Sequence, residues 1–215
     1  MEQRQLRLGD EERRFVLKAK SQRGFTIVEL MVALTIVGVM LAMGTPLIAT
    51  MIQNSKLSSA TKSYLVGIQT ARTEAIRMNR PVDFVLTDSS VAAGVSGSAN
   101  GKNWVVRWSS SGTDTLVEGK AAANGTGQQG AGSVTILGAV TAPTAGSFSG
   151  VLTFNGFGAV ASGETVALDV KNPAGGACAD ANGPMRCQRI QVRPGGQIGV
   201  CDPKAASGDS RYCQP

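Results

Sequence analysis

One apolar segment constrains this chain more than any other feature. The 26 residues of Leu30–Ser55 contain no ionisable side chain, and Glu29, directly before them, is the only ionisable residue in the run that begins at Phe25. A helix of about 20 apolar residues is long enough to cross a bilayer. We therefore predict a membrane-spanning helix over residues 25–52.

The positive charge of the chain is concentrated directly before this segment. The 215 residues carry a formal net charge of +6, and residues 1–24 hold seven Lys or Arg against four acidic residues, which is half of the excess. Basic residues beside a membrane helix stay on the cytoplasmic side. This pattern predicts a single-pass topology in which the N-terminus is cytoplasmic and the rest of the chain lies across the membrane.

The carboxylate at the start of the apolar segment needs a partner. A charged side chain within a spanning helix costs about 2.5–3.5 kcal/mol on insertion scales, and such residues are usually paired. Glu29 follows the dipeptide Gly24-Phe25 by four residues. Cleavage between Gly24 and Phe25 would create an amino terminus, and a neighbouring copy processed in this way could supply the missing positive charge.

The residues around this glutamate carry a family resemblance. Residues 23–30 read RGFTIVEL, which resembles the class III signal of type IV pilins and type II secretion pseudopilins. The resemblance implies that a prepilin peptidase removes the leader, residues 1–24, by cutting after Gly24, and then N-methylates Phe25. It also implies that Glu29 pairs with the amino terminus of an adjacent subunit. Gly38 and Pro46 fall where pilins carry helix-weakening residues.

The apolar spacing predicts that the helix continues over residues 53–80. Leu57, Ala60, Tyr64, Ile68, Ala71, Ala75 and Met78 recur at helical intervals. Pro81 should end the helix. The stretch at 69–76, QTARTEAI, further resembles the FimT/GspH branch of the family.

Short β-branched or aromatic runs follow Pro81 and predict a β-rich head over residues 81–215. They lie at 82–86, 104–108, 115–117, 134–137, 151–154, 165–170, 189–193 and 198–201. Asn155-Gly156 predicts a two-residue hairpin, in a region that also resembles the family. The segments 89–103, 119–132 and 141–150 are expected to be exposed loops. The fold class is therefore α+β: a long N-terminal helix packed on an antiparallel sheet, as in pilins.

Four cysteines, Cys178, Cys187, Cys201 and Cys213, fall in the last 38 residues. Without a CxxC pair or any histidine, they predict two disulfides rather than a metal site. Sequential pairing, Cys178–Cys187 and Cys201–Cys213, is preferred. A hairpin placing Ile190 opposite Ile198 would instead bring Cys187 opposite Cys201 and leave Cys178 to join Cys213.

Catalysis has little support in the residues, because the acidic side chains are scattered and histidine is absent. We expect no enzyme activity, no cofactor and no metal. DNA binding is an alternative, since some FimT-type minor pilins bind DNA through a Gly-Arg-x-Arg stretch. The matching residues here are Gly196-Gln197-Ile198-Gly199, which lack both arginines. Arg189 and Arg193 could contact DNA, but a solvated strand face is the preferred interpretation.

The sequence therefore predicts a minor pilin or pseudopilin that assembles through its helix into a type IV pilus or pilus-like filament, at the tip or as an initiator. Its expected partners are other pilins, the prepilin peptidase and inner-membrane lipid. Its expected location is the bacterial inner membrane, with the head in the periplasm, and then the filament. A type II secretion pseudopilin H is the alternative within the class, and a DNA-uptake receptor is the alternative from another class.

Overall fold

The computed structural model describes residues 24–121 and 134–214, and within its helix the side chains of residues 42–47 are not described. Most of the predicted leader and residues 122–132 of one predicted loop lie outside these residues. The chain divides into two compact units, Met1–Met43 and Gly44–Pro215. The first holds the start of helix α1 (Ile27–Met78), and the second holds the rest of α1 and the strands that the structure describes.

Helix α1 ends in a Schellman motif. The Arg80 N–H donates to the Ala75 carbonyl at 3.2 Å, and the Asn79 N–H donates to the Ile76 carbonyl at 3.3 Å. Asn79 has a φ of 49°, the left-handed conformation that this motif requires at its first residue beyond the helix. Pro81 follows and prevents further helix, so the predicted end at Pro81 matches the structure to within two residues.

Within the described residues, nine strands form two antiparallel sheets in the second unit. The first sheet has the order β3-β2-β1-β6, and the second has the order β5-β4-β7-β8-β9. The strands are β1 (Val82–Thr87), β2 (Asn103–Ser110), β3 (Thr113–Lys120), β4 (Thr135–Ala142), β5 (Gly146–Ser147), β6 (Val151–Phe154), β7 (Thr165–Lys171), β8 (Gln188–Val192) and β9 (Ile198–Cys201). All eight predicted strands are present; β3 and β4 extend by two residues into expected loops, and the two-residue β5 is the described strand that lies wholly in one.

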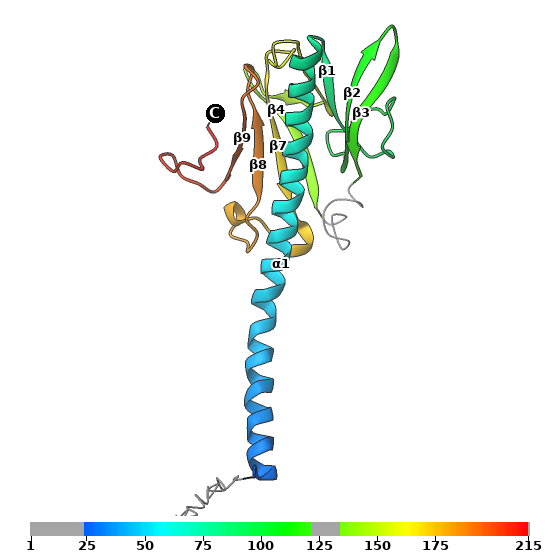
Figure 1. The fold of residues 1–215 in the computed structure, drawn as a ribbon. Helices are drawn as coiled ribbons and strands as arrows, with labels where there is room; N and C mark the ends of the chain where they lie inside the picture. The colour runs from blue at the N-terminus through cyan, green and yellow to red at the C-terminus, as the bar shows by residue number, and fades with distance from the viewer. Residues whose placement is uncertain (1–23, 122–133, 215) are drawn as a thin grey trace, which may run out of the picture. The chain divides into compact units, whose positions relative to one another are not determined.

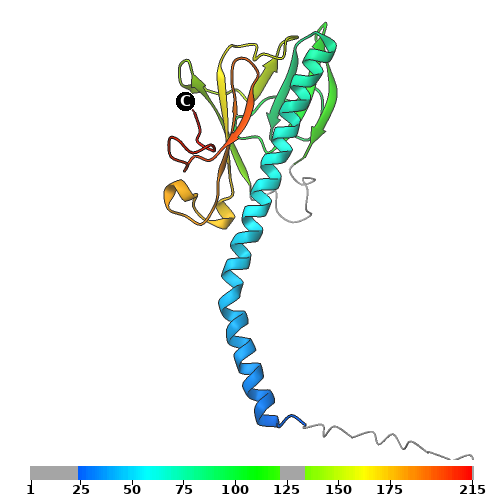
Figure 2. The ribbon, with the colours of Figure 1, turned by 60° about the vertical axis from the view of Figure 1, so that its left-hand side comes forward.

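The second half of α1 packs on both sheets around a shared core, as Figures 1 and 2 show. Leu57, Tyr64, Ile68, Ala71 and Ala75 form the buried stripe of the helix. They pack with the inward-facing side chains of both sheets, which include Phe84, Trp104, Ile136, Leu168 and Ile190. The predicted apolar stripe is therefore the core face, except that Ala60 and Met78 are only half-buried.

Gly67 allows α1 to approach the first sheet closely. A Cβ atom at this position would lie 2.8 Å from Cε3 of Trp104 and 2.9 Å from Cε2 of Phe84. Contacts of that length would force the ring or the helix to shift. The glycine therefore has a packing role, although glycine lowers the intrinsic stability of a helix.

The chain reversal after β6 is wider than predicted. Phe154 pairs with Val160 in an isolated antiparallel bridge, so the turn covers residues 155–159 rather than Asn155-Gly156 alone. The side-chain oxygen of Asn155 accepts hydrogen bonds from the backbone N–H groups of Phe157 and Ala159. These two hydrogen bonds favour a longer turn, because a turn with only two central residues would not contain both N–H groups.

The segment between β1 and β2 is not simply an exposed loop. The Arg107 guanidinium donates to the carbonyls of Ala93 and Val95, both at 2.8 Å. The Ser98 N–H donates to the Leu86 carbonyl, and Gly101 is buried. The segment predicted as an exposed loop over 89–103 is thus fixed to the first sheet by backbone bonds, which its Gly/Ser/Ala composition did not indicate.

Candidate assembly site

The predicted processing and assembly residues lie at the start of α1, in the first unit. Gly24 and Phe25 are exposed, Phe25 to 83 %, and they precede the helix. Thr26 is the residue before the first helical turn, and its hydroxyl accepts a hydrogen bond from the Glu29 N–H at 3.2 Å. The structure therefore begins the helix two residues beyond the predicted cleavage point.

Thr26 caps the start of the helix, a role that was not predicted from the sequence. A threonine followed three residues later by glutamate has the spacing of a capping box, which is a recognisable sequence signal. Glu29 also lies in the first turn of α1, where the partial positive charge of the helix N-terminus favours a carboxylate. Glu29 thus has a local role in starting the helix, in addition to any role between subunits.

The described apolar side chains of this unit are exposed. Ile27, Val28, Leu30, Leu34 and Leu41 each have more than half of their surface accessible. A continuous apolar surface of this kind marks a site of contact with lipid or protein. Among the residues that the structure describes, no helix combines the length and apolarity needed to cross a membrane. The span predicted over residues 25–52 is not confirmed.

The two predicted helix-weakening residues both lie within α1, which is assigned as helix throughout. A Cβ atom at Gly38 would have no neighbour within 4 Å, so no packing contact of the chain requires glycine there. Pro46 is among the residues whose side chains are not described. Their weakening effect stays a prediction.

The C-terminal cysteines pair sequentially in the structure. Cys178 bonds to Cys187 and Cys201 bonds to Cys213. The hairpin between β8 and β9 turns near Pro194-Gly195, as expected, but its register differs from the rival scheme. Val192 lies opposite Ile198, and Arg189 lies opposite Cys201. This two-residue difference moves Cys187 away from Cys201 and removes the geometric basis for the rival pairing.

The segment between β7 and β8 contacts the middle of α1, and the disulfide Cys178–Cys187 closes the later part of this segment. Asn172, which is buried, donates to both the backbone and the side-chain oxygens of Gln53, at 3.2 and 2.9 Å. The Arg186 N–H donates to the side-chain oxygen of Asn54 at 2.8 Å. Gln53 and Asn54 are the first amide side chains after the predicted span over residues 25–52, and no role was predicted for them from the sequence. They fix the point at which α1 meets the head.

The two arginines considered for DNA contact have partners within the chain. Arg189 lies directly opposite Asp169 across β7 and β8 and forms two hydrogen bonds with its carboxylate, at 2.6 and 3.0 Å. This hydrogen bonding raises the pKa of the Arg189 guanidinium. Arg193 donates to the side-chain oxygen of Gln214 at 2.8 Å. The structure supports the strand-face interpretation, and DNA contact stays an untested prediction.

The helix, its N-terminal motif and the antiparallel head define a pilin-like protein. The model of the prokaryotic N-terminal methylation motif matches residues 19–45. The model of the type II transport protein GspH matches residues 60–196, which is more than half of the chain. The chain therefore belongs to the GspH family of minor pilins and pseudopilins, whose members are structural proteins and not enzymes.

Two solved structures are also similar to the chain. Both are crystal structures of the type IV minor pilin FimU from Pseudomonas aeruginosa (strain PAO1). One is 15 % identical, with a TM-score of 0.47, and covers 68 % of this chain and 88 % of its own. The other is 14 % identical, with a TM-score of 0.44, and covers 66 % and 90 %. A comparison with curated proteins finds no match.

The methylation motif indicates how the chain is processed, what it assembles with and where it is located. It implies processing by a prepilin peptidase and assembly with other pilin subunits. It also implies a membrane-anchored component of a pilus or pilus-like filament.

Proposed function

We propose that this chain is a minor subunit that assembles through α1 into a type IV pilus, at its tip or as its initiator. A single carboxylate, Glu29, lies in the first turn of an apolar helix directly behind a cleavage glycine, and this observation carries the proposal. The mature chain begins at Phe25, which is N-methylated. Glu29 then pairs with the amino terminus of a neighbouring subunit.

The proposal gives each part of the chain a role. Residues 1–24 are a leader that keeps the N-terminus cytoplasmic until it is removed. Residues 25–52 anchor the chain in the inner membrane before assembly and pack against other helices afterwards; they include residues 42–47, whose side chains are not described. Residues 53–80 support the periplasmic head, residues 81–215. The exposure of the apolar side chains before Met43 supports these roles, because water is an unfavourable solvent for them.

The pairing follows from charge and solvent. An unpaired carboxylate in an apolar environment is costly, while a carboxylate hydrogen-bonded to an ammonium group is stabilised strongly when water is excluded. Cleavage after Gly24 creates that ammonium group four residues before Glu29. The pairing of one subunit with the next selects the register in which their helices assemble. The helix then leaves lipid for a protein environment without leaving its charge uncompensated.

Substitutions at Glu29 test the pairing separately from the helix cap. Glu29→Gln keeps a side chain that can accept a hydrogen bond at the helix start but removes the charge. Glu29→Asp keeps the charge. We expect Glu29→Gln and Glu29→Ala to reduce recovery in sheared filaments at least tenfold, with normal amounts of processed chain in the membrane, while Glu29→Asp retains partial incorporation. Wild-type incorporation of Glu29→Gln would refute the pairing.

Substitution at Gly24 tests the processing step. Gly24→Val should leave the full-length chain in the membrane fraction, visible as a slower band on a gel. N-terminal sequencing of the wild-type chain should start at Phe25, with N-methylphenylalanine as the first residue. A wild-type chain that retains residues 1–24 in assembled filaments would refute the leader assignment.

A type II secretion pseudopilin is the second candidate, because the matching family model describes a type II transport protein. The two candidates differ in what is lost when the gene is deleted. Loss of surface pili with normal export of folded proteins supports the pilus subunit. Loss of export with normal pili supports the secretion pseudopilin.

A further inference from the structure

The end of the head where α1 enters it, which Figures 1 and 2 show, carries cationic side chains from three parts of the chain. Lys56 lies on α1, Lys171 is the last residue of β7, and Arg186 lies in the segment between β7 and β8. Lys171 and Arg186 are exposed, and Lys56 is half-buried. We call these three residues the basic rim of the head.

Hydrogen bonds fix the height of the basic rim along α1. Asn172, which directly follows Lys171, donates to the side-chain oxygen of Gln53 at 2.9 Å. The Arg186 N–H donates to the side-chain oxygen of Asn54 at 2.8 Å. These bonds place the two head residues beside the helix turn that also carries the rim lysine of α1. The three cations therefore lie within about one turn of each other along the helix axis.

This height coincides with the end of the proposed membrane span over residues 25–52. Lys56 lies four residues beyond the span, which is about 6 Å at 1.5 Å per residue. The headgroup region of a bilayer extends about 5–8 Å beyond the hydrocarbon core on each side. The basic rim therefore lies at the level of the lipid phosphates.

The side chains of the basic rim lack the partners that other cations of the head have. Among the described residues, no hydrogen bond or ion pair involves the side chain of Lys56, Lys171 or Arg186. Every other arginine after residue 24 contacts a carboxylate, an amide or carbonyl oxygen, or an aromatic ring. These arginines are Arg72, Arg77, Arg80, Arg107, Arg189, Arg193 and Arg211. The rim therefore keeps its charge available for a ligand outside the chain.

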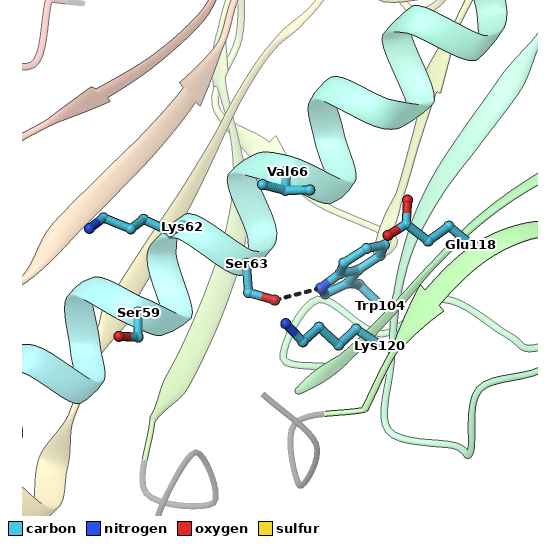
Figure 3. Close-up of a pocket in the computed structure, with 7 residues that line it drawn as sticks. All are labelled: Ser59, Lys62, Ser63, Val66, Trp104, Glu118 and Lys120. Carbon is cyan, nitrogen blue, oxygen red and sulfur yellow. Dashed lines mark hydrogen bonds between the residues drawn. The ribbon is translucent and has the colours of Figure 1, made fainter. Parts of the chain in front are cut away.

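Two further lysines lie just above the basic rim. Lys62 is exposed on α1, and Lys120, the last residue of β3, lies beside Ser63 of the helix (Figure 3). At 1.5 Å per residue they are about 10 Å farther along α1 than the rim. The Debye length at physiological ionic strength is about 8 Å, so both lysines still contribute to the attraction of an anionic surface at the rim.

Positive charge on this flank of a membrane span is unusual. Lys and Arg concentrate on the cytoplasmic side, counted within about 15–20 residues of the span. Lys56 and Lys62 fall within that distance on the opposite side of the proposed span. The acidic side chains near this end of the head are Asp88, Glu118 and Asp180, and among the described residues none of them forms an ion pair with the rim. Binding of an anionic ligand compensates for cations that oppose the topology.

We propose that the basic rim binds the phosphates of anionic phospholipids and docks the head on the periplasmic surface of the inner membrane before assembly. The inference rests on the proposed function, because that function places the bilayer at residues 25–52. It adds a contact between the head and the lipid surface to the insertion of α1 into lipid. The contact must break when the subunit enters a filament, so anionic lipid favours the anchored state over the assembled state.

The membrane anchor makes a modest charge sufficient. Each basic residue near an anionic surface strengthens the attraction about fivefold, which is a small gain for a ligand captured from solution. Helix α1 already holds the rim at the bilayer, so the contact with lipid is intramolecular and has a high effective concentration. The same side chains can therefore bind lipid phosphate without capturing a polyanion from solution.

A fluorescent label beside the rim reports docking of the full-length chain. All four cysteines are in disulfides, so a cysteine introduced by Ala174→Cys provides the thiol for labelling. Ala174 is exposed in the short helix Pro173–Gly175, at the same end of the head as the rim. The labelled chain is reconstituted at one copy per nanodisc, which removes contacts between subunits. The nanodiscs contain a quenching spin label in the lipid headgroup region.

The comparison is between neutral phosphatidylcholine alone and the same lipid with about 30 % phosphatidylglycerol, which supplies the anionic surface. We expect quenching of the label at position 174 to be at least twofold stronger with phosphatidylglycerol. The difference between the two lipids should disappear in about 1 M salt, where the Debye length falls to about 3 Å.

Two charge-matched double variants assign the contact to the rim. Lys171→Gln with Arg186→Gln removes two positive charges there and should lower the ratio of docked to undocked heads at least tenfold, at about fivefold per residue. Arg77→Gln with Arg193→Gln removes the same charge elsewhere and should leave the ratio unchanged. Arg77 lies about 30 Å along α1 from the rim, and Arg193 lies beyond the far end of β8. None of the four side chains is buried, and equal thermal transitions would verify that both variants stay folded.

Three outcomes would overturn the inference: equal quenching in the two lipids, a difference between the lipids that persists at high salt, or equal effects of the two double variants. Insertion of α1 is measured separately with a label at Leu34→Cys and brominated acyl chains as quencher. If position 34 is quenched while position 174 responds equally to both lipids, the headgroup contact fails and the proposed anchor stands. If position 34 is not quenched, the membrane span fails, and the proposed function fails with it.

Discussion

Tyr64 shows how one residue of α1 is held in the head. Its hydroxyl donates to the Lys102 carbonyl at 2.9 Å, and its ring is 5 % exposed in the shared core. Burial raises the pKa of this phenol from 10.0 to about 12, because the charged phenolate would lose its hydration. The folded chain therefore prefers the neutral phenol more strongly than the unfolded chain does.

This preference predicts a loss of stability at alkaline pH. The contribution of Tyr64 is fully present below pH 10, where the phenol is neutral in both states, and is lost as the pH rises from 10 to about 12. Two pKa units correspond to about 2–3 kcal/mol. The drop in unfolding free energy between pH 9 and 12 should be smaller in Tyr64→Phe by about that amount. Equal drops in both proteins would contradict the assignment.

Arg189 is the residue where the structure changes the functional interpretation most. The sequence places it on a strand with its side chain outward, and the structure adds Asp169 directly opposite on the neighbouring strand. A bidentate bond between guanidinium and carboxylate leaves little free charge for a phosphate. The acidic partner lies twenty residues earlier in the chain, so only the pairing of β7 with β8 could identify it.

At the scale of elements, the loop between β7 and β8 contains a disulfide and also contacts helix α1. The disulfide Cys178–Cys187 closes this loop with a sequence separation of 9, and the loop contains Met185, which is fully buried. The residues that flank Met185 accept from or donate to Asn54 of α1. The loop therefore acts as a support for the helix where the helix reaches the head.

Removal of this disulfide should loosen α1 locally. Cys178→Ser with Cys187→Ser frees a short loop, which costs about 2–3 kcal/mol of stability by the loop-entropy relation. Because Pro184 and Arg186 of this closed loop bond to Asn54, amide hydrogen exchange over residues 50–57 should rise in this variant more than exchange over residues 64–75.

The second disulfide provides the matched control for that experiment. Cys201–Cys213 has a sequence separation of 12, so its removal should cost a similar free energy. It closes the tail beside β9, and no backbone–backbone hydrogen bond joins the described part of this tail to α1. Cys201→Ser with Cys213→Ser should leave exchange over residues 50–57 unchanged. An equal rise in hydrogen exchange in both variants would show that the loop closed by Cys178–Cys187 does not stabilise the helix specifically.

At the scale of the whole molecule, the distribution of charge determines the prospect of DNA binding more than the net charge does. Half of the net charge of +6 belongs to residues 1–24, which the methylation motif implies are removed. The processed chain would carry only +3. Its two candidate DNA-contacting arginines are bonded to Asp169 and Gln214. A small net charge with paired arginines is a poor basis for binding a polyanion.

The processed chain should therefore not bind duplex DNA in a salt-sensitive manner. In neutral detergent, we expect no shift of a DNA fragment in gel electrophoresis between 50 and 200 mM salt, conditions chosen because phosphate contacts weaken steeply over about this range. Asp169→Ala removes the partner of Arg189. Comparing the DNA shift of this variant with that of the wild-type chain tests whether the pair keeps Arg189 from contacting DNA. A salt-sensitive shift by the wild-type chain that is lost in Arg189→Ala would contradict the prediction.

The sequence by itself determined the long helix, its end at Pro81, eight of the strands and the processing motif, because each depends on local periodicity or on a few adjacent residues. Only the tertiary structure decided the register of the β8–β9 hairpin, the partner of Arg189 and the contacts of the β7–β8 segment with Gln53 and Asn54. These features join residues that are far apart in the chain, and their contacts depend on how the helix and the two sheets pack.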